Sequence, residues 1–174
     1  MPRLFAFLGL FVLLVMPMQT RAASDGSQSQ LRTLEQTFAT AMNAENVDAV
    51  MSVYAPGDAL FVFDVVGPPS VHFGWDAYRK AFEQMFAAIR GPLHLTMSDL
   101  DVEVSGDIGY GRSLQRVSGI HAKGGAPFDY TVRVTDVYRK IGDRWLIVQE
   151  HLSLPIDRGT FTPLLHVSFP LSRG

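Results

Sequence analysis

The segment FDYTVRVTDVYRKIGDRWLIVQEHLSLP, residues 128–155, decides the fold because it encodes two long antiparallel strands joined by a tight turn. Side chains alternate between the faces of a strand, so one mainly apolar face of the first half carries Tyr130, Val132, Val134, Asp136 and Tyr138. Gly142 supplies the positive φ angle that the turn requires. The return half is apolar up to Val148 and polar at residues 149–151, and Pro155 ends it. A hairpin with one carboxylate on its apolar face is typical of a pocket wall.

Three helices and further strands flank this hairpin in the sequence. Apolar residues recur at helical spacing in residues 28–44, 47–54 and 76–89, and Asn46 is placed to cap the second of these helices. Strands are predicted at residues 59–64, 71–73, 93–104, 110–121, 128–140 and 144–153. This order predicts an α+β fold, in which a cone-shaped curved antiparallel sheet carries three N-terminal helices packed on it. The hollow of such a cone is suited to a ligand.

The first 22 residues have the features of a secretory signal peptide. A short basic start precedes an apolar run at residues 4–16 that is too short to span a bilayer, and Thr20-Arg21-Ala22 fits a cleavage site. We therefore expect cleavage near Ala22 and an exported protein, periplasmic or secreted; an uncleaved N-terminal anchor is the alternative. The mature chain divides into a polar leader at residues 23–30, one domain at residues 31–155 and a tail at residues 156–174. The tail is either a late strand at residues 164–171 or an arm that lies on another subunit.

The composition argues against several kinds of partner. The formal net charge of −2 provides neither a basic face for nucleic acid nor a cationic surface for a membrane after signal cleavage. Because the chain has no cysteine, it forms no disulfide and carries no lipid anchor at the cleavage site. The five histidines are scattered and no HExxH motif is present, so we expect no metal and no other cofactor.

Three segments resemble the nuclear transport factor 2-like superfamily, in its ketosteroid isomerase and SnoaL-like (polyketide cyclase) branch. They are MNAENVDAVMSVYAPGDALFVFD at residues 42–64, VVGPPSVHFG at residues 65–74 and TDVYRKIGDRWLIVQEHLSLP at residues 135–155. The order of predicted elements is similar as well, from about Leu31 to Pro155. The resemblance implies the fold predicted above, a cavity for a small molecule and a homodimer formed through the sheet.

The resemblance also implies roles for single residues. Asp64 matches an aspartate that shuttles a proton, Asp136 matches a carboxyl that stays protonated and donates to the ligand oxygen, and Tyr54 matches a supporting tyrosine. Two positions depart from the isomerase pattern, because Phe38 replaces the main tyrosine donor and Phe82 replaces a further supporting tyrosine. Loss of one preorganised donor lowers a rate by ~10²–10³. The resemblance thus implies a similar pocket whose chemistry either differs from steroid isomerisation or is absent.

Both aspartates also have a structural interpretation. Asp64 is either a base with a pKa raised by a dry cavity, or a strand-end side chain that caps the amides of residues 65–67. Asp136 either lines the pocket or forms an ion pair with an arginine on a neighbouring strand. The candidates for that pairing are Arg112, Arg116 and Arg133.

The other polar candidates depend on which way their side chains face. Glu150 and His151 are adjacent on a strand and point to opposite faces, so only one of them lines the cavity. The sequence leaves this choice open. His151 is either a proton shuttle or a histidine bonded to backbone at a sheet edge, and His72 lies either at the mouth of the cone or in solvent. The aromatic residues of the third predicted helix, Phe82 among them, form either a ligand cage or part of the core.

These observations predict an exported domain that binds a small, mostly apolar molecule bearing a carbonyl or hydroxyl group. In the first hypothesis it is an enzyme that transfers a proton alpha to a carbonyl, as an isomerase, cyclase or dehydratase, with Asp64 as base. Asp136 is then the neutral donor or second carboxylate and Tyr54 a supporting hydroxyl. The remaining candidates for the binding site are Phe38, Phe82, His72, Glu150 and His151. The alternatives are a non-catalytic ligand binder and a dimeric association module whose cavity is filled by phenylalanines.

Overall fold

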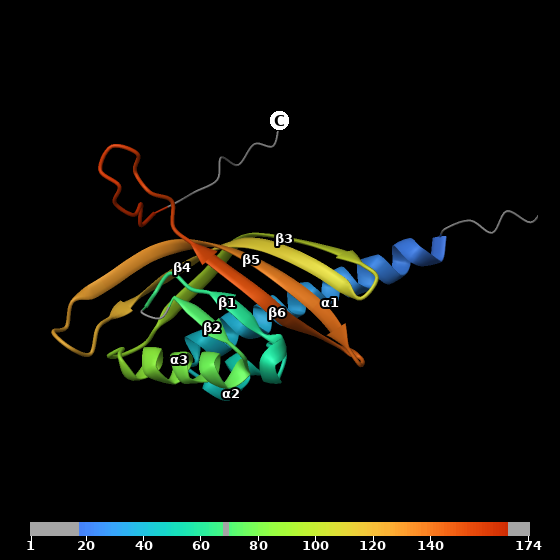
Figure 1. Cartoon of the computed structure of the whole chain (residues 1–174), viewed down its shortest axis with the longest axis horizontal. Helices are drawn as coiled ribbons and strands as arrows, with labels where there is room; N and C mark the ends of the chain where they lie inside the picture. Colours follow the sequence, from blue (N-terminus) through green and yellow to red (C-terminus); the bar gives the residue numbers. More distant parts are fainter. Residues whose placement is uncertain (1–17, 68–69, 167–174) are drawn as a thin grey trace, which may run out of the picture.

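The computed structural model describes residues 18–67 and 70–166 and shows a mixed α+β fold around one curved six-stranded sheet (Figure 1). Its helices are α1 (Met18–Asn43), α2 (Val47–Met51) and α3 (Trp75–Ala87), and a 3-10 turn spans Gly57–Ala59. Its strands are β1 (Phe61–Phe63), β2 (Val71–Phe73), β3 (His94–Ser105), β4 (Ile108–Ile120), β5 (Pro127–Ile141) and β6 (Arg144–Ser153). Of the three helices, α2 is a single short turn of 5 residues.

The strand order in the sheet is β2-β1-β6-β5-β4-β3. Strands β3 to β6 form the antiparallel meander that the sequence predicts, but β1 runs parallel to β6. The expectation of a wholly antiparallel sheet is therefore wrong at this one pairing. No tight turn joins β1 to β6, because α3 and four strands intervene, and only a tight turn would force the two strands to be antiparallel.

The predicted hairpin of residues 128–155 is confirmed, with Ile141 opposite Arg144 and Gly142 at φ 61°. The boundaries of the N-terminal elements differ more from the prediction. The first helix starts at Met18 instead of residue 28, and the second ends at Met51 instead of residue 54. The strand predicted at residues 59–64 is shorter, because the 3-10 turn takes its beginning and Asp64 lies just beyond its end.

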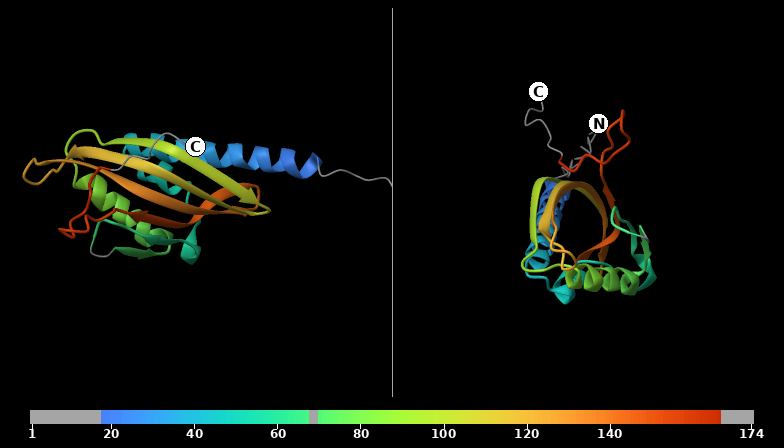
Figure 2. Two further views of the ribbon diagram at one scale, coloured as in Figure 1. Left: turned by 90° about the horizontal axis from the view of Figure 1, so that it is seen from above. Right: turned by 90° about the vertical axis from the view of Figure 1, so that its left-hand side faces the viewer.

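Helix α1 lies along the sheet and contributes its apolar stripe to the main core. Seen end-on in the right-hand view of Figure 2, the sheet curls strongly, with α1 along one side and α3 across its open side. The buried side chains of the stripe are Leu31, Leu34, Phe38, Ala41 and Met42. At the end of the helix the Asn43 side chain exchanges two hydrogen bonds with the backbone of Leu95, at 2.7 and 2.9 Å. These bonds fix the helix end against β3.

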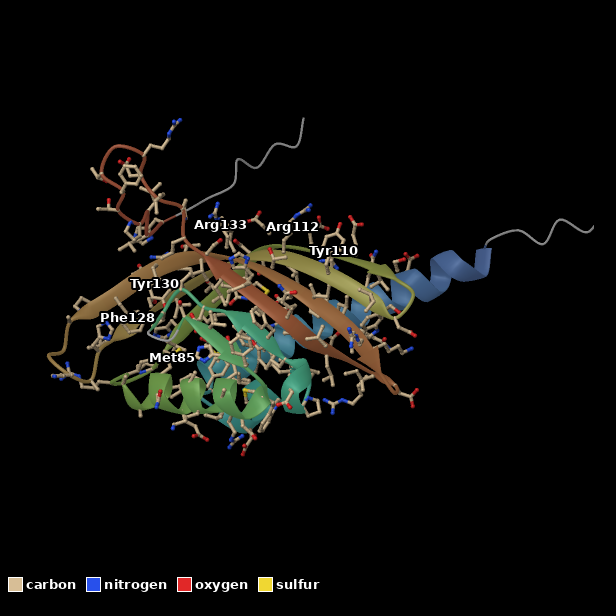
Figure 3. All side chains as sticks on the ribbon, viewed as in Figure 1. Met85, Tyr110, Arg112, Phe128, Tyr130 and Arg133 are labelled. Carbon is tan, nitrogen blue, oxygen red and sulfur yellow. The ribbon has the colours of Figure 1, made fainter. Side chains whose placement is uncertain are left out.

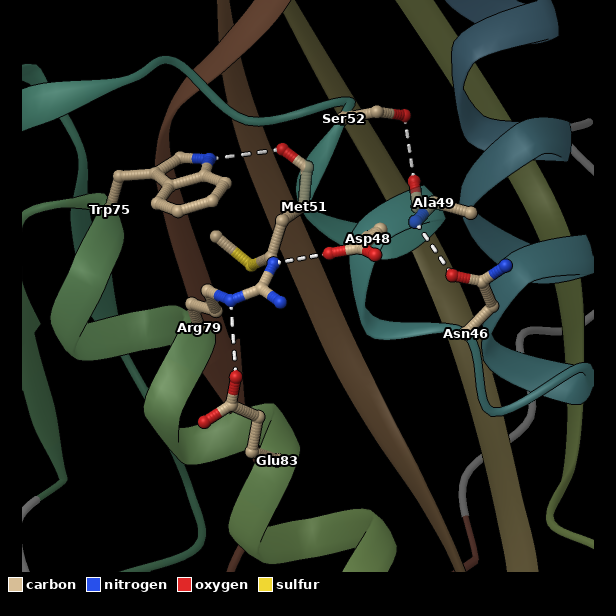
Figure 4. A network of polar contacts seen from close by, with 8 residues as sticks. All are labelled: Asn46, Asp48, Ala49, Met51, Ser52, Trp75, Arg79 and Glu83. Atoms are coloured by element: carbon tan, nitrogen blue, oxygen red, sulfur yellow. Dashed lines mark hydrogen bonds and ion pairs between the residues drawn. The ribbon is translucent and has the colours of Figure 1, made fainter.

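Helix α3 is held against α2 by polar contacts (Figure 4). The Trp75 indole donates to the carbonyl of Met51 at 3.1 Å, and Arg79 bridges Asp48 on α2 and Glu83 on its own helix. The predicted N-cap is confirmed, because the Asn46 side chain accepts from the Ala49 amide at 3.0 Å. The two helices thus form one lid over the open side of the sheet.

The structure tests the predictions for the two ends of the chain only in part. The predicted signal peptide lies mostly outside the described residues, so export and cleavage stay predictions. Among the helices within residues 18–67 and 70–166, none has the length and apolarity needed to cross a membrane. Residues 154–166 form an irregular loop, in which the carbonyl of Leu165 accepts from the Thr131 amide at 2.6 Å. Residues 164–166 are not a strand, and the rest of the expected late strand lies outside the described part of the chain.

Two glycines of β4 let larger groups approach the sheet. A Cβ atom on Gly109 would lie 2.8 Å from Leu31 of α1, and one on Gly111 would overlap the hydroxyl of Tyr138 on β5. A distance below about 3 Å is tighter than van der Waals contact allows, so neighbours would have to move. The pair therefore sets how closely α1 and the ring of Tyr138 pack on β4.

Replacing Gly111 with alanine should destabilise the domain by roughly 1–3 kcal/mol, because the added methyl group displaces the buried Tyr138 ring. Urea unfolding followed by circular dichroism measures this change. Gly26→Ala is the matched control, because nothing lies within 4 Å of its Cβ position in α1. That variant should be stabilised by up to about 1 kcal/mol through helix propensity. Equal effects of the two substitutions would contradict the steric argument.

Candidate functional site

A cavity of about 540 Å³ lies between the inner face of the sheet and α3. Its lining is mainly apolar and comes from α1 and α3, from strands β2 to β6 and from the loop after β1. The polar side chains in the lining are Asp64, His72, Tyr78, Gln84, Gln115, His121 and Tyr130. In Figure 3 the lining residues Met85, Phe128 and Tyr130 lie on the side of the sheet toward α3, whereas Tyr110, Arg112 and Arg133 lie on the opposite side.

Asp64 and His72 meet at the wall of this cavity. Asp64 follows directly after β1 and His72 is the central residue of β2, so the β1–β2 pairing brings them together. The Asp64 Oδ2 atom lies 3.5 Å from His72 Nε2, and both side chains are largely buried, at 17% and 10% exposure. The other carboxylate oxygen, Oδ1, accepts from the Val66 amide at 2.9 Å. One oxygen of Asp64 therefore caps the loop, as the structural interpretation predicts, and the other faces the histidine.

His72 is neither a solvated loop residue nor isolated at the mouth. Its ring packs against Tyr78 of α3, with centroids 5.2 Å apart, and Tyr78 in turn packs against Phe82 at 4.6 Å. Tyr78 and Phe82 both line the cavity and belong to the buried core. The aromatic residues of the third helix therefore serve as core and as cavity wall together.

Glu150 of β6 lies behind this wall, where two tyrosines bond to it. Its Oε2 atom accepts from the Tyr54 hydroxyl at 2.5 Å and its Oε1 atom accepts from the Tyr78 hydroxyl at 3.0 Å. The side chain is buried, and this burial raises its pKa from 4.5 to about 7, although the two tyrosine bonds act in the opposite direction. Glu150 is not part of the lining itself, but Tyr78 connects it to the cavity.

A β-bulge determines that Glu150 points inward. Across β5, Asp136 pairs with Glu150 but Tyr138 pairs with Ile147, so β6 holds one extra residue between them. Val148 falls in this interval and packs in a second, smaller core on the other face of the sheet. The bulge changes the parity of β6, with Ile147 before it and Glu150 after it on the same inner face. His151 consequently lies on the outer face and is exposed, with its ring 5.4 Å from that of Phe63.

Asp136 joins Glu150 in a cluster of buried carboxyl groups instead of lining the cavity. It is 3% exposed, and its Oδ1 atom has no hydrogen-bond partner among the described residues. Burial, together with the charges of Glu35 and Glu150, raises the pKa of Asp136 well above its ordinary value. A neutral carboxyl group is the state that this site favours.

The predicted ion pair of Asp136 is not found. Arg112 bonds Asp101 and Arg116 bonds Asp129, both on the outer side of the sheet, and Arg133 is exposed there. The reason is strand parity, because these arginines lie on the face opposite to the one that carries Asp136. The interpretation of Asp136 as a partner of Arg112, Arg116 or Arg133 is therefore wrong.

Glu35 of α1 completes the cluster. It is 1% exposed and accepts from the Tyr138 hydroxyl at 2.6 Å. Burial raises its pKa from 4.5 to about 7, against the lowering effect of the Tyr138 bond. Three carboxyl groups from α1, β5 and β6 therefore interact inside the core. We refer to Glu35, Asp136 and Glu150 as the carboxyl cluster.

The structure brings some predicted site residues together and separates others. Asp64, His72 and Phe82 line the cavity, whereas Phe38 and Tyr54 lie in the core behind it. The sequence analysis did not select Glu35, and it considered Tyr78 only as one of the aromatic residues of the third helix, not as a polar group of the site. Both positions carried a signal, since Tyr78 lies one helical turn before Phe82 and Glu35 falls within the apolar stripe of α1. A charged residue on an apolar stripe is the kind of exception that marks a buried polar group.

Metal binding has no support in the described residues, where no group of three histidine, aspartate or glutamate side chains is arranged to hold an ion. The members of the carboxyl cluster are bonded to tyrosine hydroxyls or, in Asp136, carry one oxygen that makes no bond.

Comparisons with known proteins agree with this architecture. A family model described as "SnoaL-like domain" matches residues 31–157. A solved structure of an NTF2-like protein from Pseudomonas putida KT2440 is similar, with a TM-score of 0.73, 24% identity and coverage of 83% of this chain and 98% of that one. No curated protein sequence gives a significant match to the chain.

The descriptions of two other similar structures name an enzyme or an enzyme-like protein. One is a ketosteroid isomerase-like protein from Erwinia carotovora atroseptica, with a TM-score of 0.60, 16% identity and coverage of 71% of this chain and 92% of that one. The other is a hexachlorocyclohexane dehydrochlorinase of type 2, with a TM-score of 0.66, 15% identity and coverage of 87% and 96%. At these identities the likeness establishes the fold and leaves the chemistry open.

The carboxyl cluster should make the domain less stable as the pH rises from about 5 to about 8. Glu35 and Glu150 have a pKa of about 7 in the folded protein and near 4.5 when unfolded, so folding retains their protons in this interval. Stability is fully present below the unfolded pKa and is lost as the pH passes the folded pKa, by roughly 3 kcal/mol for each group. Urea unfolding at a series of pH values measures this loss.

The Glu35→Gln and Glu150→Gln variants should each show a shallower loss of unfolding free energy over the same pH interval. Asp143→Asn, in the exposed turn between β5 and β6, is the control and should retain the wild-type slope. A wild-type stability that stays constant or rises between about pH 5 and about pH 8 would show that these carboxyl groups ionise freely in the folded protein.

Proposed function

The chain belongs to the SnoaL-like domain family of the nuclear transport factor 2-like superfamily, and on this premise we propose that it transfers a proton alpha to a carbonyl of a small ligand. The ligand is a mostly apolar molecule that bears a carbonyl or hydroxyl group. The observation that carries the proposal is the Asp64–His72 pair, 3.5 Å apart, at the wall of a mainly apolar cavity of about 540 Å³. A cavity of this size accommodates one small molecule and excludes most of the water around it.

Asp64 is the base in this proposal. Its Oδ1 atom is fixed by the Val66 amide, so its Oδ2 atom is left to receive a proton from the carbon next to the ligand carbonyl. The electrons of the broken C–H bond move onto the carbonyl oxygen and form an enolate. His72 lies beside Oδ2 and restricts its orientation. Return of the proton to another carbon completes an isomerisation. In a dehydration, a hydroxyl on the neighbouring carbon leaves with the proton held by Asp64 as water, which restores the Asp64 carboxylate.

Asp136 has an indirect part in the proposal. Because it lies behind the cavity wall beside Glu150, it acts on the site through Glu150, whose proton affinity depends on neighbouring acidic groups. Proton transfer of this kind requires only a base and an acid, so the proposal includes no cofactor. Tyr54 supports the site in the same indirect way, through its bond to Glu150.

The second candidate is a non-catalytic binder that uses the same cavity. The third, an association module with a filled cavity, has less support, because the phenylalanines expected to fill it do not do so. Phe82 forms part of the wall, while Phe61 packs on Phe63 and on the exposed Phe73, and none of these three residues is in the lining. We retain export and a homodimer through the sheet as parts of the proposal, supported by the N-terminal sequence and the family resemblance.

Asp64→Asn should lower the rate of α-proton exchange in a small ketone by about 10²–10⁴-fold, because an amide cannot accept the proton. Exchange in D₂O is followed by proton NMR with cyclohex-2-enone and 1-indanone as first substrates. Asparagine keeps an oxygen that can accept from the Val66 amide, so the loop should stay in place. Asp58→Asn, on the exposed 3-10 turn, is the control with an unchanged rate.

The exchange experiment separates the two leading candidates. Wild-type protein that binds these ketones without accelerating exchange would favour the binder. Exchange that persists undiminished in Asp64→Asn would assign the base to another residue.

Enlarging a residue of the cavity wall should block the ligand. Ala81→Leu enlarges a side chain on the face of α3 that lines the cavity. It should weaken binding of 1-indanone by about tenfold or more, because the leucine occupies space that the ligand needs and the neighbouring side chains would have to move to restore it. Ala87→Leu, on the exposed side of the same helix, is the matched control with unchanged affinity. Isothermal titration calorimetry gives both values. Equal affinities in the two variants would place the ligand elsewhere.

A further inference from the structure

Glu150 has more hydrogen-bonding options than the Asp64 mechanism uses. As a carboxylate it accepts from Tyr54 at 2.5 Å and from Tyr78 at 3.0 Å, so both phenol protons point toward it. As a carboxylic acid it carries a proton of its own, which needs an acceptor. Among the described residues, the hydrogen-bond partners of its two oxygens are the two tyrosine hydroxyls, and one of these must then change from donor to acceptor.

Tyr78 is the tyrosine that can change. The Tyr54 bond to Glu150 is the shorter one, and Tyr54 lies in the core away from the cavity lining. Tyr78 lines the cavity, so a proton that leaves its bond with Glu150 can point toward a bound ligand. With Glu150 protonated, the glutamic acid donates to Tyr78 and the Tyr78 hydroxyl is free to donate to an oxygen atom in the cavity.

We propose that Tyr78 is the catalytic acid of the cavity, donating its hydroxyl proton to the ligand oxygen, and that Glu150 is the positioning residue that replaces this proton. In the step itself the Tyr78 O–H bond breaks as the ligand O–H bond forms. At the same time the Glu150 O–H bond breaks and a new Tyr78 O–H bond forms, which leaves a Glu150 carboxylate. This inference rests on the proposed function, because it supplies the acid that a base at Asp64 requires.

The environment of Glu150 supports a role as proton store. Burial raises its pKa to about 7, so it gains and loses a proton near neutrality, whereas burial holds the pKa of Tyr78 well above its ordinary value. The titratable groups around Glu150 come from all elements packed near it: Glu35 on α1, Tyr54 after α2, Asp64 and His72 at β1 and β2, Tyr78 on α3, and Asp136 and Tyr138 on β5. Negative charges on the acidic members of this set disfavour the ionised form of Glu150.

A phenolate tests the proposal, because its oxygen resembles that of an enolate. The probe is 2,4-dinitrophenol, which is ionised throughout the range from about pH 5.5 to about pH 8.5, and binding to the full chain is measured by its absorbance change. If only the form with protonated Glu150 offers the Tyr78 donor, affinity is constant below about pH 7 and falls by about tenfold for each pH unit above it.

Three variants distinguish control of the Tyr78 donor by Glu150 from a general effect of pH on binding. Glu150→Gln should bind tightly at every pH, because its amide can donate to Tyr78 as the protonated glutamate does. Tyr78→Phe should bind weakly at every pH, because it has no hydroxyl. Glu35→Gln, which alters a buried carboxyl bonded to Tyr138 and not to Tyr78, should keep the pH dependence with a lower midpoint. Circular dichroism of each variant shows that it is folded.

Several results would overturn the proposal. A wild-type protein that fails to bind the phenolate near pH 5.5, or binds it equally at all pH values, has no proton-controlled donor of this kind. A pH dependence that persists in both Glu150→Gln and Tyr78→Phe would assign the effect to a different titratable group and reject the Tyr78 donor. Failure of the proposed function is distinguished by the exchange assay, which depends on Asp64: proton-controlled phenolate binding without ketone exchange supports the Tyr78 donor and rejects the enzyme.

Discussion

The bonds from Tyr54 and Tyr78 to Glu150 are the interaction on which the arrangement of this domain depends. A buried carboxyl group is expensive unless its oxygens receive hydrogen bonds, and Glu150 receives two. Its partners come from the segment after α2 and from α3, while Glu150 itself is on β6. The requirement to satisfy one side chain therefore fixes both parts of the helical lid against the sheet. It also fixes the position of the cavity, because Tyr78 is part of its wall.

The bulge in β6 is what makes this arrangement possible, and it also limited what the sequence could reveal. Alternation along the β5–β6 hairpin correctly predicted the inner face of β5, including Asp136 and Tyr138. The same rule could not choose between Glu150 and His151, because one extra residue at Val148 reverses the parity of β6 midway. A bulge leaves no mark in a run of apolar residues such as residues 145–148. The fold could be predicted from periodicity, whereas the direction in which the Glu150 side chain points is set by a local irregularity in β6.

Long-range pairing was the other source of information that periodicity lacks. The sequence marked Asp64 by its place at a strand end, but only the β1–β2 pairing shows that His72 lies next to it. Tyr78 was grouped with its apolar neighbours on α3, because helical spacing does not show which residue a tyrosine hydroxyl contacts. Glu35 was missed although it interrupts an apolar stripe, because its partner Tyr138 is 103 residues away in the chain. Candidate residues were thus predictable by type and position, and their partnerships were not.

The carboxyl cluster has a cost that its structural role alone does not explain. Buried ionisable groups can often be replaced by apolar residues of similar size without loss of stability. This domain contains no disulfide to offset the cost, and it still buries three acids beside an apolar cavity. The two polar centres of the site also have different surroundings: Asp64 is bonded to a backbone amide and faces a histidine, whereas Glu150 is enclosed by phenols and other acids. The enclosure of Glu150 raises its pKa to about 7, and a carboxyl group that retains its proton near neutrality is able to supply that proton to a neighbouring group.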